Sequence, residues 1–267
     1  MADYETLEVE REGALVWCTL NRPERFNAMS PGLVDDLHAL LDCVRADREA
    51  RVLLLRGAGK HFCAGLDLKE SGGGEGGPGR VSGGLRGQSH ISELAIKLHN
   101  LPQPVISLVH GAASGGGFAL ALASDVRIAA DSMRMNAAFI RIGLSACDVG
   151  VSYFLPRIVG LSLASELMLT GNFIDAERAL AAGLVSRVVP QDELENTGRE
   201  LALAMVRNSP LGLRLTKEGL RHAVDAGSLE AAVAIEDRNQ ILCSQSPDVA
   251  EGVRAFLQKR EPEYSDA

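Results

Sequence analysis

The sequence predicts an α/β fold followed by a helical C-terminal region. Three observations lead to this expectation. Strand and helix signals alternate over the first half of the chain, glycine-marked turns separate them, and only helical periodicity remains after about residue 192. The chain has 267 residues, of which 46% are hydrophobic, which is enough to bury one large core.

The first predicted elements are two strands, over residues 7–10 and 14–20, joined by a tight turn at residues 11–13. Ser30 followed by Pro31 predicts a helix start, because the serine side chain can cap the helix and the missing proline N–H costs nothing in the first turn. The alternation continues with a helix over residues 33–44, buried strands over 52–57 and 104–111, a helix over 118–124 and a strand over 125–130.

Residues 71–88 form a glycine-rich segment, in which 9 of 18 residues are glycine. Such a segment cannot bury much apolar area, so we expect a flexible loop within the core region and not a domain boundary. The pattern does not favour a phosphate-binding loop, because it lacks GxxxxGK[ST] and does not link a strand directly to a helix.

Four amphipathic helical segments with short breaks end the chain. We therefore predict an α/β core over residues 1–195 and a C-terminal helical layer over residues 196–267 that makes contacts between copies of the chain. Simple coverage of the core by these helices is an equally good interpretation. The four segments span residues 193–208, 212–226, 228–243 and 247–260.

The composition argues against several classes of protein. The net charge is −8 and no basic stripe is present, which disfavours nucleic-acid binding. No apolar run approaches the roughly 18–20 residues of a membrane-spanning helix, and the N-terminus lacks a signal peptide, so we expect a cytoplasmic protein. Five widely spaced cysteines without CxxC predict reduced thiols, and six scattered histidines without HExxH predict no metal site.

Two glycine-marked turns are the strongest candidates for a functional site: residues 61–70 (HFCAGLDLKE) and 110–125 (HGAASGGGFALALASD). In the second, three glycines at 115–117 stand where a buried strand turns into a helix. The bare backbone exposes N–H groups at the helix start, where the dipole favours negative charge. N–H groups from both turns would form an oxyanion hole for a thioester enolate. The alternative is that the glycines only allow close packing of helix and strand.

Several separate stretches together carry a resemblance to a known family. They are, in order along the chain, LNRPERFNAMS, AGLDLKE, HGAASGGGFALALASD, GLSACDVGVSYFLPRIVG, LMLTG with AERALAAGLVSRVV, and AFLQKREPEY. In this combination the chain resembles the enoyl-CoA hydratase/isomerase, or crotonase, superfamily from end to end.

The resemblance implies a spiral of ββα units whose C-terminal helices pack protomers into a homotrimer or hexamer. It also implies acyl-CoA thioesters as ligands, with coenzyme A as part of the substrate and no separate cofactor. The family holds the acyl carbonyl with two backbone N–H groups, which correspond here to Leu66 and Gly116. Arg25 and Lys259 correspond to groups that contact coenzyme A in the family. An equally good interpretation is that both are ordinary solvated surface charges. The adenine-pocket segment corresponds to Ala64, Gly65, Leu66, Asp67 and Leu68.

The chain departs from the family's hydratases at both usual glutamate positions. Ala119 stands where the GGGxE pattern has the first glutamate, and Phe139 stands where the second is usual. Neither side chain can transfer a proton, so hydration by two carboxylates is not supported. Asp148 remains, in the region where dienoyl-CoA isomerases and an aryl-CoA dehalogenase of the family have an active-site acid. An alternative interpretation is that Asp148 is the N-cap of the helix that follows it.

Three nearby residues could also carry protons or act as nucleophiles. We expect Cys147 to be a buried thiol, because no histidine stands near it in the sequence. His110 is interpreted as a packed histidine at a strand end. His90 is expected to begin the helix after the glycine-rich loop, either near the acyl chain or simply on the surface.

The sequence therefore predicts an acyl-CoA-processing enzyme of the hydratase/isomerase type. The N–H groups of Leu66 and Gly116 would stabilise a thioester enolate, and Asp148 would be the acid/base. One-base isomerisation is favoured, because a single carboxylate can remove and return a proton. Two alternatives remain open: a catalytically silent acyl-CoA-binding protein, and a CoA-thioester hydrolase or dehalogenase that uses Asp148.

Overall fold

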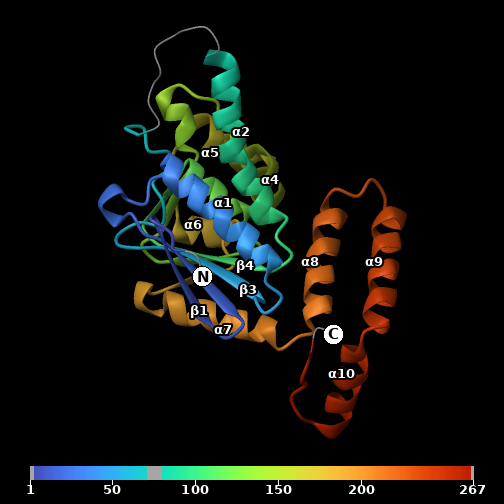
Figure 1. The fold of residues 1–267 in the computed structure, drawn as a ribbon. Helices are drawn as coiled ribbons and strands as arrows, with labels where there is room; N and C mark the ends of the chain where they lie inside the picture. Colours follow the sequence, from blue (N-terminus) through green and yellow to red (C-terminus); the bar gives the residue numbers. More distant parts are fainter. Residues whose placement is uncertain (1–2, 71–79, 266–267) are drawn as a thin grey trace.

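The computed structural model describes residues 3–70 and 80–265. Its centre is a six-stranded sheet with the strand order β1-β2-β3-β4-β6-β9 (Figure 1). The first two strands are antiparallel and every other neighbouring pair is parallel. The strands are β1 (Leu7–Glu12), β2 (Leu15–Leu20), β3 (Val52–Gly57), β4 (Val105–Val109), β6 (Val126–Ala130) and β9 (Arg187–Val189).

A second, three-stranded sheet has the order β5-β7-β8, with β5 at Ala112–Ser114, β7 at Arg134–Asn136 and β8 at Ile174–Asp175. The chain passes from β4 of the large sheet to β5 of the small one, and again from β6 to β7, before entering helical structure each time. This repetition of two strands and a helix is the predicted spiral of ββα units.

Helices cover both faces of the large sheet, as expected where parallel strands are buried on both sides. In β3, Leu53 and Leu55 face the larger core, whereas Val52 and Leu54 face a smaller core against α7 (Figure 1). The helices before the C-terminal region are η1 (Pro23–Arg25), α1 (Pro31–Ala46), α2 (Arg80–His99), α3 (Gly116–Ala123), η2 (Ala138–Ile142), α4 (Val151–Val159), α5 (Leu161–Thr170), α6 (Ala176–Ala181), η3 (Gln191–Glu193) and α7 (Leu194–Val206).

The start of α1 is the one that the sequence predicts. The Ser30 hydroxyl accepts a hydrogen bond from the N–H of Leu33 at 3.2 Å, and Pro31 occupies the first helical position. The apolar positions at three-to-four spacing are buried, which confirms the predicted inner face.

The predicted turn between the first two strands is wrong by a residue or two. β1 continues to Glu12, and the turn comprises Gly13 and Ala14. Gly13 has φ +58°, a left-handed conformation that suits a two-residue hairpin turn.

The glycine-rich loop predicted over residues 71–88 is wrong for its second half. Helix α2 begins at Arg80, so residues 80–88 are helical, while 71–79 lie outside the described residues. His90 consequently lies within the helix and does not begin it. The glycines of this stretch disfavour a helix by about 1 kcal/mol each, but buried Leu94 and Leu98 anchor the following turns on the core, and the helix extends back from them.

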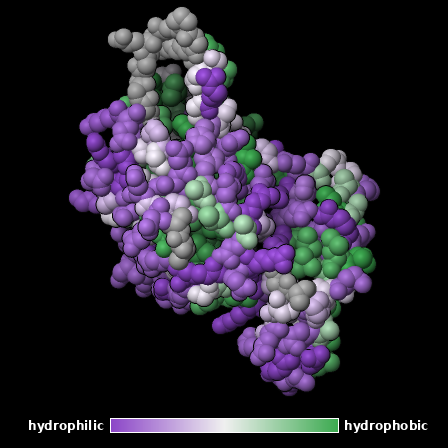
Figure 2. Space-filling model, viewed as in Figure 1, coloured by the Kyte–Doolittle hydropathy of each residue, from purple (hydrophilic) through white to green (hydrophobic). Residues whose placement is uncertain are grey.

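The last three helices project from the core as an arm, defined here as residues 210–258 (Figure 1). They are α8 (Pro210–Val224), α9 (Leu229–Ser244) and α10 (Pro247–Gln258), which together with α7 confirm the four predicted helical segments. The division of the chain at residue 195 stays a prediction. Figure 2 shows hydrophobic surface over the α8–α9 hairpin. The large exposed apolar side chains of the arm include Leu220, Val224, Leu229, Ile241, Leu242, Val253, Phe256 and Leu257.

None of the helices in the described part of the chain combines the length and the apolar character needed to cross a membrane.

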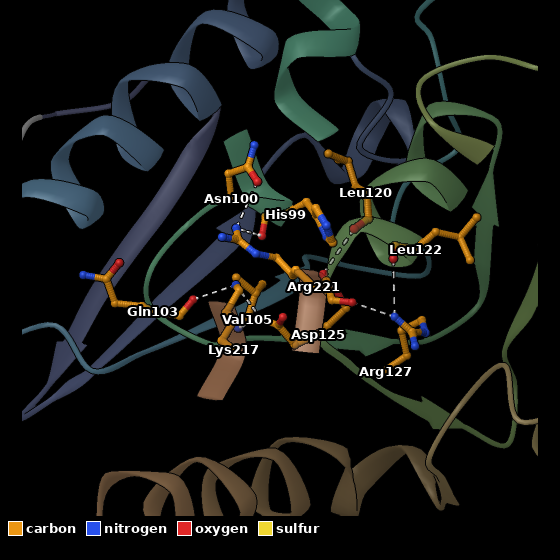
Figure 3. A network of polar contacts seen from close by, with 12 residues as sticks. His99, Asn100, Gln103, Val105, Leu120, Leu122, Asp125, Arg127, Lys217 and Arg221 are labelled. Atoms are coloured by element: carbon orange, nitrogen blue, oxygen red, sulfur yellow. Dashed lines mark hydrogen bonds and ion pairs between the residues drawn. The ribbon is translucent and has the colours of Figure 1, made fainter. Parts of the chain in front are cut away.

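A polar network around the buried Lys217 attaches the arm to the core (Figure 3). The Lys217 ammonium on α8 donates to the Gln103 carbonyl at 2.9 Å and lies 2.6 Å from the Asp125 carboxylate. Asp125 also accepts a hydrogen bond from the N–H of Val105 at 2.7 Å. One turn further along α8, Arg221 donates to the His99 carbonyl at 3.0 Å. Burial lowers the pKa of Lys217, and the Asp125 carboxylate opposes that shift.

We predict that Asp125→Ala lowers the free energy of unfolding by about 3 kcal/mol, because it leaves the buried Lys217 ammonium without its carboxylate partner. Urea denaturation measures the change. Arg254→Ala is the matched control, since Arg254 is 62% exposed and lies 3.4 Å from Glu251. It should change stability by less than about 0.5 kcal/mol. Equal unfolding free energies for the two variants would contradict the proposed anchoring role.

Candidate active site

The two glycine turns singled out in the sequence lie against each other. Cys63 and Ala113 form an isolated parallel bridge, with the N–H of Cys63 donating to Ala112 at 3.1 Å and the N–H of Ser114 donating to Cys63 at 3.0 Å. Gly65 has φ +93°, and a Cβ atom added to it would lie 2.7 Å from the Ser114 carbonyl oxygen. A larger residue at 65 would therefore separate the two turns.

The Leu66 N–H points away from the strand segment of Met29, which lies beside it. Met29 and Leu66 form a parallel bridge in which the Met29 N–H donates to Gly65 at 2.7 Å and the Asp67 N–H donates to Met29 at 3.0 Å. Those bonds engage the neighbours of Leu66 and not Leu66 itself. Its N–H makes none of the turn or loop backbone hydrogen bonds among the described residues.

The Gly116 N–H is available for a different reason. Gly116 is the first residue of α3, where an N–H group has no acceptor within the helix. The adjacent Gly115 N–H instead donates to Asn136 at 3.0 Å. A Cβ atom on Gly116 would lie 2.6 Å from the Met29 sulfur and 4.0 Å from the Gly65 Cα, so both turns meet at this point.

A cavity of about 130 Å³ opens beside these two turns. Among its described lining residues, Gln88 and Asp148 are the two with polar side chains, and the others present apolar groups or backbone. The lining comprises Met29, Ala64, Gly65, Leu66, Leu68, Gln88, Ile91, Gly115, Gly116, Ala138, Phe139, Ile142, Leu144, Asp148 and Val149. Five of the predicted site residues in the two turns, and the predicted acid, are thus brought together.

Asp148 is half-buried at the end of the loop that precedes α4. Its Oδ1 accepts hydrogen bonds from the Gln88 side-chain amide at 2.6 Å and from the Val149 N–H at 2.8 Å. Burial raises the pKa of Asp148 above its usual value, and the two hydrogen bonds oppose that shift. A carboxyl group with a raised pKa in an apolar pocket is typical of an acid/base site.

The alternative role of Asp148 as a helix cap does not match the geometry. The N-cap of α4 is Gly150, and no side chain caps that helix. Between them lies Val149, a β-branched residue with φ +45°. For a β-branched residue this backbone conformation is strained, and residues strained in this way cluster at active sites, ligand clamps and switch regions.

The two usual glutamate positions contribute no acid. Ala119 is fully buried inside α3, and Phe139 forms part of the apolar wall of the cavity. A Cβ atom on Gly115 would lie 3.6 Å from the Phe139 ring, so the ring packs beside the second glycine turn. Asp148 is therefore the one acid among the described residues that line the cavity.

Three predicted ligand-binding residues lie outside the cavity lining. Arg25 ends η1 and is exposed, and Lys259 is the exposed C-cap of α10 on the projecting arm. Asp67 is buried and stabilises the loop in which it stands. Its carboxylate accepts hydrogen bonds from the N–H groups of Lys69 and Glu70 and from the Arg22 side chain. Burial alone would raise the pKa of Asp67, but these donors together lower it.

The other residues considered in the sequence are also away from the cavity. His110 is buried after β4 and its Nε2 lies 3.0 Å from the Gly59 carbonyl oxygen, which confirms the packed interpretation. Burial lowers the pKa of His110. Cys147 is exposed, so the prediction of a buried thiol is wrong, because the loop after η2 places it on the surface.

Gln88 is the main site residue that the sequence interpretation missed. It stands in the segment taken for a loop, which hid its position on α2. A signal was present, because Ile91, Leu94 and Leu98 repeat at helical spacing, and Gln88 lies one turn earlier on the same face.

Comparison with known proteins gives matches over almost the whole chain. The family model described as enoyl-CoA hydratase/isomerase matches residues 10–267. The chain is 40% identical over 251 residues to a probable enoyl-CoA hydratase, EchA12, of Mycobacterium tuberculosis, covering 93% of this chain and 88% of the relative. It is 38% identical over 258 residues to 1,2-epoxyphenylacetyl-CoA isomerase of Escherichia coli, covering 95% and 96%.

Solved structures agree with the predicted fold class. The crystal structure of an enoyl-CoA hydratase from Bacillus anthracis superposes with a TM-score of 0.93 at 34% identity, covering 98% of this chain and all of that one. A probable enoyl-CoA hydratase/isomerase from Mycobacterium abscessus gives a TM-score of 0.89 at 36% identity, over 98% and 99%. With the family model, the relatives and the fold in agreement, this chain belongs to the enoyl-CoA hydratase/isomerase, or crotonase, family.

Proposed function

We propose that this protein is an acyl-CoA isomerase that moves a double bond with Asp148 as its single acid/base. The observation that carries the proposal is the composition of the cavity: two available backbone N–H groups, one carboxylate and otherwise apolar walls. The 38% identity to a protein named 1,2-epoxyphenylacetyl-CoA isomerase supports isomerisation of a CoA thioester, although not the movement of a double bond as such.

The thioester carbonyl would lie between the N–H groups of Leu66 and Gly116. When a proton leaves the acyl chain, negative charge develops on the carbonyl oxygen, and fixed N–H donors stabilise that charge without reorganisation. The start of α3 adds the positive end of a helix dipole at the same point.

Asp148 would then take the proton and return it. Its carboxylate removes a proton from one carbon of the acyl chain, the electron pair moves into the conjugated enolate, and the same proton is delivered to another carbon while the double bond shifts. The carboxylate is regenerated, and no water is consumed. The raised pKa of Asp148 brings it nearer to the working pH and so assists both transfers.

The coenzyme A portion would extend from the cavity along residues 64–68, and no separate cofactor is required. Arg25 is next in sequence to Phe26, whose carbonyl oxygen accepts a hydrogen bond from the Ala64 N–H at 3.0 Å, so the η1 region lies beside this segment. Lys259 would have to come from a neighbouring copy, because α10 lies on the projecting arm, away from α2 and α4 of its own chain (Figure 1).

We predict that Asp148→Asn lowers kcat by at least about 10²-fold, the usual size of a general acid–base contribution. Binding of acyl-CoA should be retained, because the amide has the same shape and can accept the same hydrogen bonds. The assay follows double-bond migration and hydration of enoyl-CoA substrates of several chain lengths, with binding measured by calorimetry.

The wild-type result separates the candidate functions. Tight acyl-CoA binding without turnover would overturn the proposal in favour of a silent binding protein. Turnover by Asp148→Asn at the wild-type rate would remove Asp148 from the mechanism. Unfolding measurements are the control for Asp148→Asn. Because the pKa of Asp148 is higher in the folded than in the unfolded protein, ionisation of its carboxyl group destabilises the fold once the pH exceeds the unfolded-state pKa. At neutral pH the uncharged variant should therefore be no less stable than wild type.

A second prediction concerns Gln88, whose amide donates to the Asp148 carboxylate at 2.6 Å. That bond favours the ionised form, so Gln88→Leu should raise the pKa of Asp148 further. Because the reaction begins with ionised Asp148, the acidic limb of the kcat–pH profile should move to higher pH. Ser89→Ala, at the exposed neighbouring position, should leave the profile unchanged. An acidic limb at the same pH in Gln88→Leu would show that Gln88 does not tune the acid.

We also propose that the apolar arm mediates self-association into a homotrimer or hexamer. Leu242 and Phe256 are 48% and 82% exposed in the single chain, which is costly for large apolar side chains gathered on one segment. Sedimentation velocity at micromolar concentration should show a trimer or larger, and Leu242→Glu with Phe256→Glu should shift it towards monomer. Leu180→Glu, on α6 of the core, is the control that should not. A monomeric wild type would refute the proposal.

A further inference from the structure

Outside the cavity, α1 and α2 bring together three side chains that can bind a metal. Each of His38, His90 and Glu93 offers one ligand atom, and these atoms all lie within 4.8 Å of one another. His90 and Glu93 are three residues apart on α2, and Asp35 and His38 are three apart on α1, so each pair shares one helix face. The histidines gave no metal-binding pattern in the sequence because they come from helices about 50 residues apart.

The hydrogen bonds of the two histidines fix where their protons lie. His38 Nε2 lies 2.8 Å from the His90 carbonyl oxygen, and a carbonyl only accepts, so His38 Nε2 carries the proton. His90 Nε2 lies 2.7 Å from Asp35 Oδ1, and an ionised carboxylate likewise only accepts. In the neutral form of each ring, Nδ1 therefore keeps its lone pair, and no hydrogen bond among the described residues engages it.

This arrangement is the one that metal-binding histidines usually have. A ligating imidazole normally donates its other N–H to a carbonyl or carboxylate, which fixes the ring and raises its basicity. Both histidines meet that condition, and His38 is only 7% exposed, so its ring is held between the two helices.

A single ion requires the His90 ring to leave its present position. The two rings stack with centroids 4.4 Å apart and an angle of 18° between their planes, so their in-plane lone pairs do not yet converge. Ligand atoms about 2.0–2.1 Å from a tetrahedral zinc ion lie roughly 3.3 Å from one another. The side chains of His90 and Asp35 are 48% and 68% exposed, so they are free to turn together out of the stack towards the lone pair of His38.

We propose that His38, His90 and Glu93 bind one divalent transition-metal ion, with Asp35 orienting His90 and water completing the coordination. Two imidazoles and one carboxylate suit Zn²⁺, whereas Mg²⁺ and Ca²⁺ prefer oxygen ligands alone. The ion would join α1 to α2 two residues from Gln88, and so stabilise the part of α2 that borders the cavity.

Calorimetric titration of the full-length, chelator-treated and reduced protein with Zn²⁺ tests the site, with Co²⁺ as a spectroscopic probe. Wild type should bind one ion per chain. His90→Gln and Glu93→Gln should each weaken binding at least tenfold, and Asp35→Ala about 10–100-fold through loss of its hydrogen bond to His90. His222→Gln, an exposed histidine on α8, is the matched control and should bind as wild type. Mg²⁺ should give no saturable binding.

Three results would overturn the site. The first is the absence of saturable Zn²⁺ or Co²⁺ binding to wild type. The second is undiminished binding by His90→Gln and Glu93→Gln, with circular dichroism showing that both remain folded. The third is a thiolate-to-cobalt absorption band, which would assign the ion to a cysteine such as exposed Cys43 or Cys147.

Discussion

The structure depends on a backbone-to-backbone contact between two turns that have no room for side chains. A Cβ atom on Gly117 would lie 2.3 Å from the Cys63 carbonyl oxygen, and one on Gly65 would lie 2.7 Å from that of Ser114. Only glycine permits this approach. Through it, the small sheet is continued by the bridge between Cys63 and Ala113, and α3 begins directly beside the other turn.

The proposed chemistry depends on the same contact. Leu66 and Gly116, one from each turn, both line the cavity, and within the described part of the chain neither N–H has a backbone hydrogen-bond partner outside regular helices and strands. The helix dipole of α3 adds positive potential at the same point. The rest of the cavity comes from distant elements, α2 with Gln88 and the loop before α4 with Asp148. The site thus combines two backbone N–H donors, fixed by the contact between the turns, with the Asp148 carboxylate, whose position depends on packing between elements distant in the sequence.

The sequence could predict features that depend on local patterns. The cap at Ser30, the two glycine turns, and Asp148 as the acid near them all follow from short stretches or from the family resemblance, and the structure places the turns and Asp148 around one cavity. The position of Gln88 was missed because the glycines around it disfavour a helix and outweighed the helical spacing of the apolar residues that follow. The stacking of His38 on His90 could not be predicted, because it requires a contact between helices remote in sequence.

Phe139 has a consequence for the fate of an intermediate in the cavity. The ring and its neighbours Ala138, Ile142 and Leu144 form a wall whose side chains offer water no hydrogen bond. A confined water molecule needs about two to four polar partners to be held in place. The enolate itself can only recover a proton, whereas a conjugated enoyl thioester held against this wall could add water at its β carbon, and the dry surface disfavours that addition. Product selectivity would then be set by the hydration of one wall, so that a single polar substitution there could let the same thioester take up water.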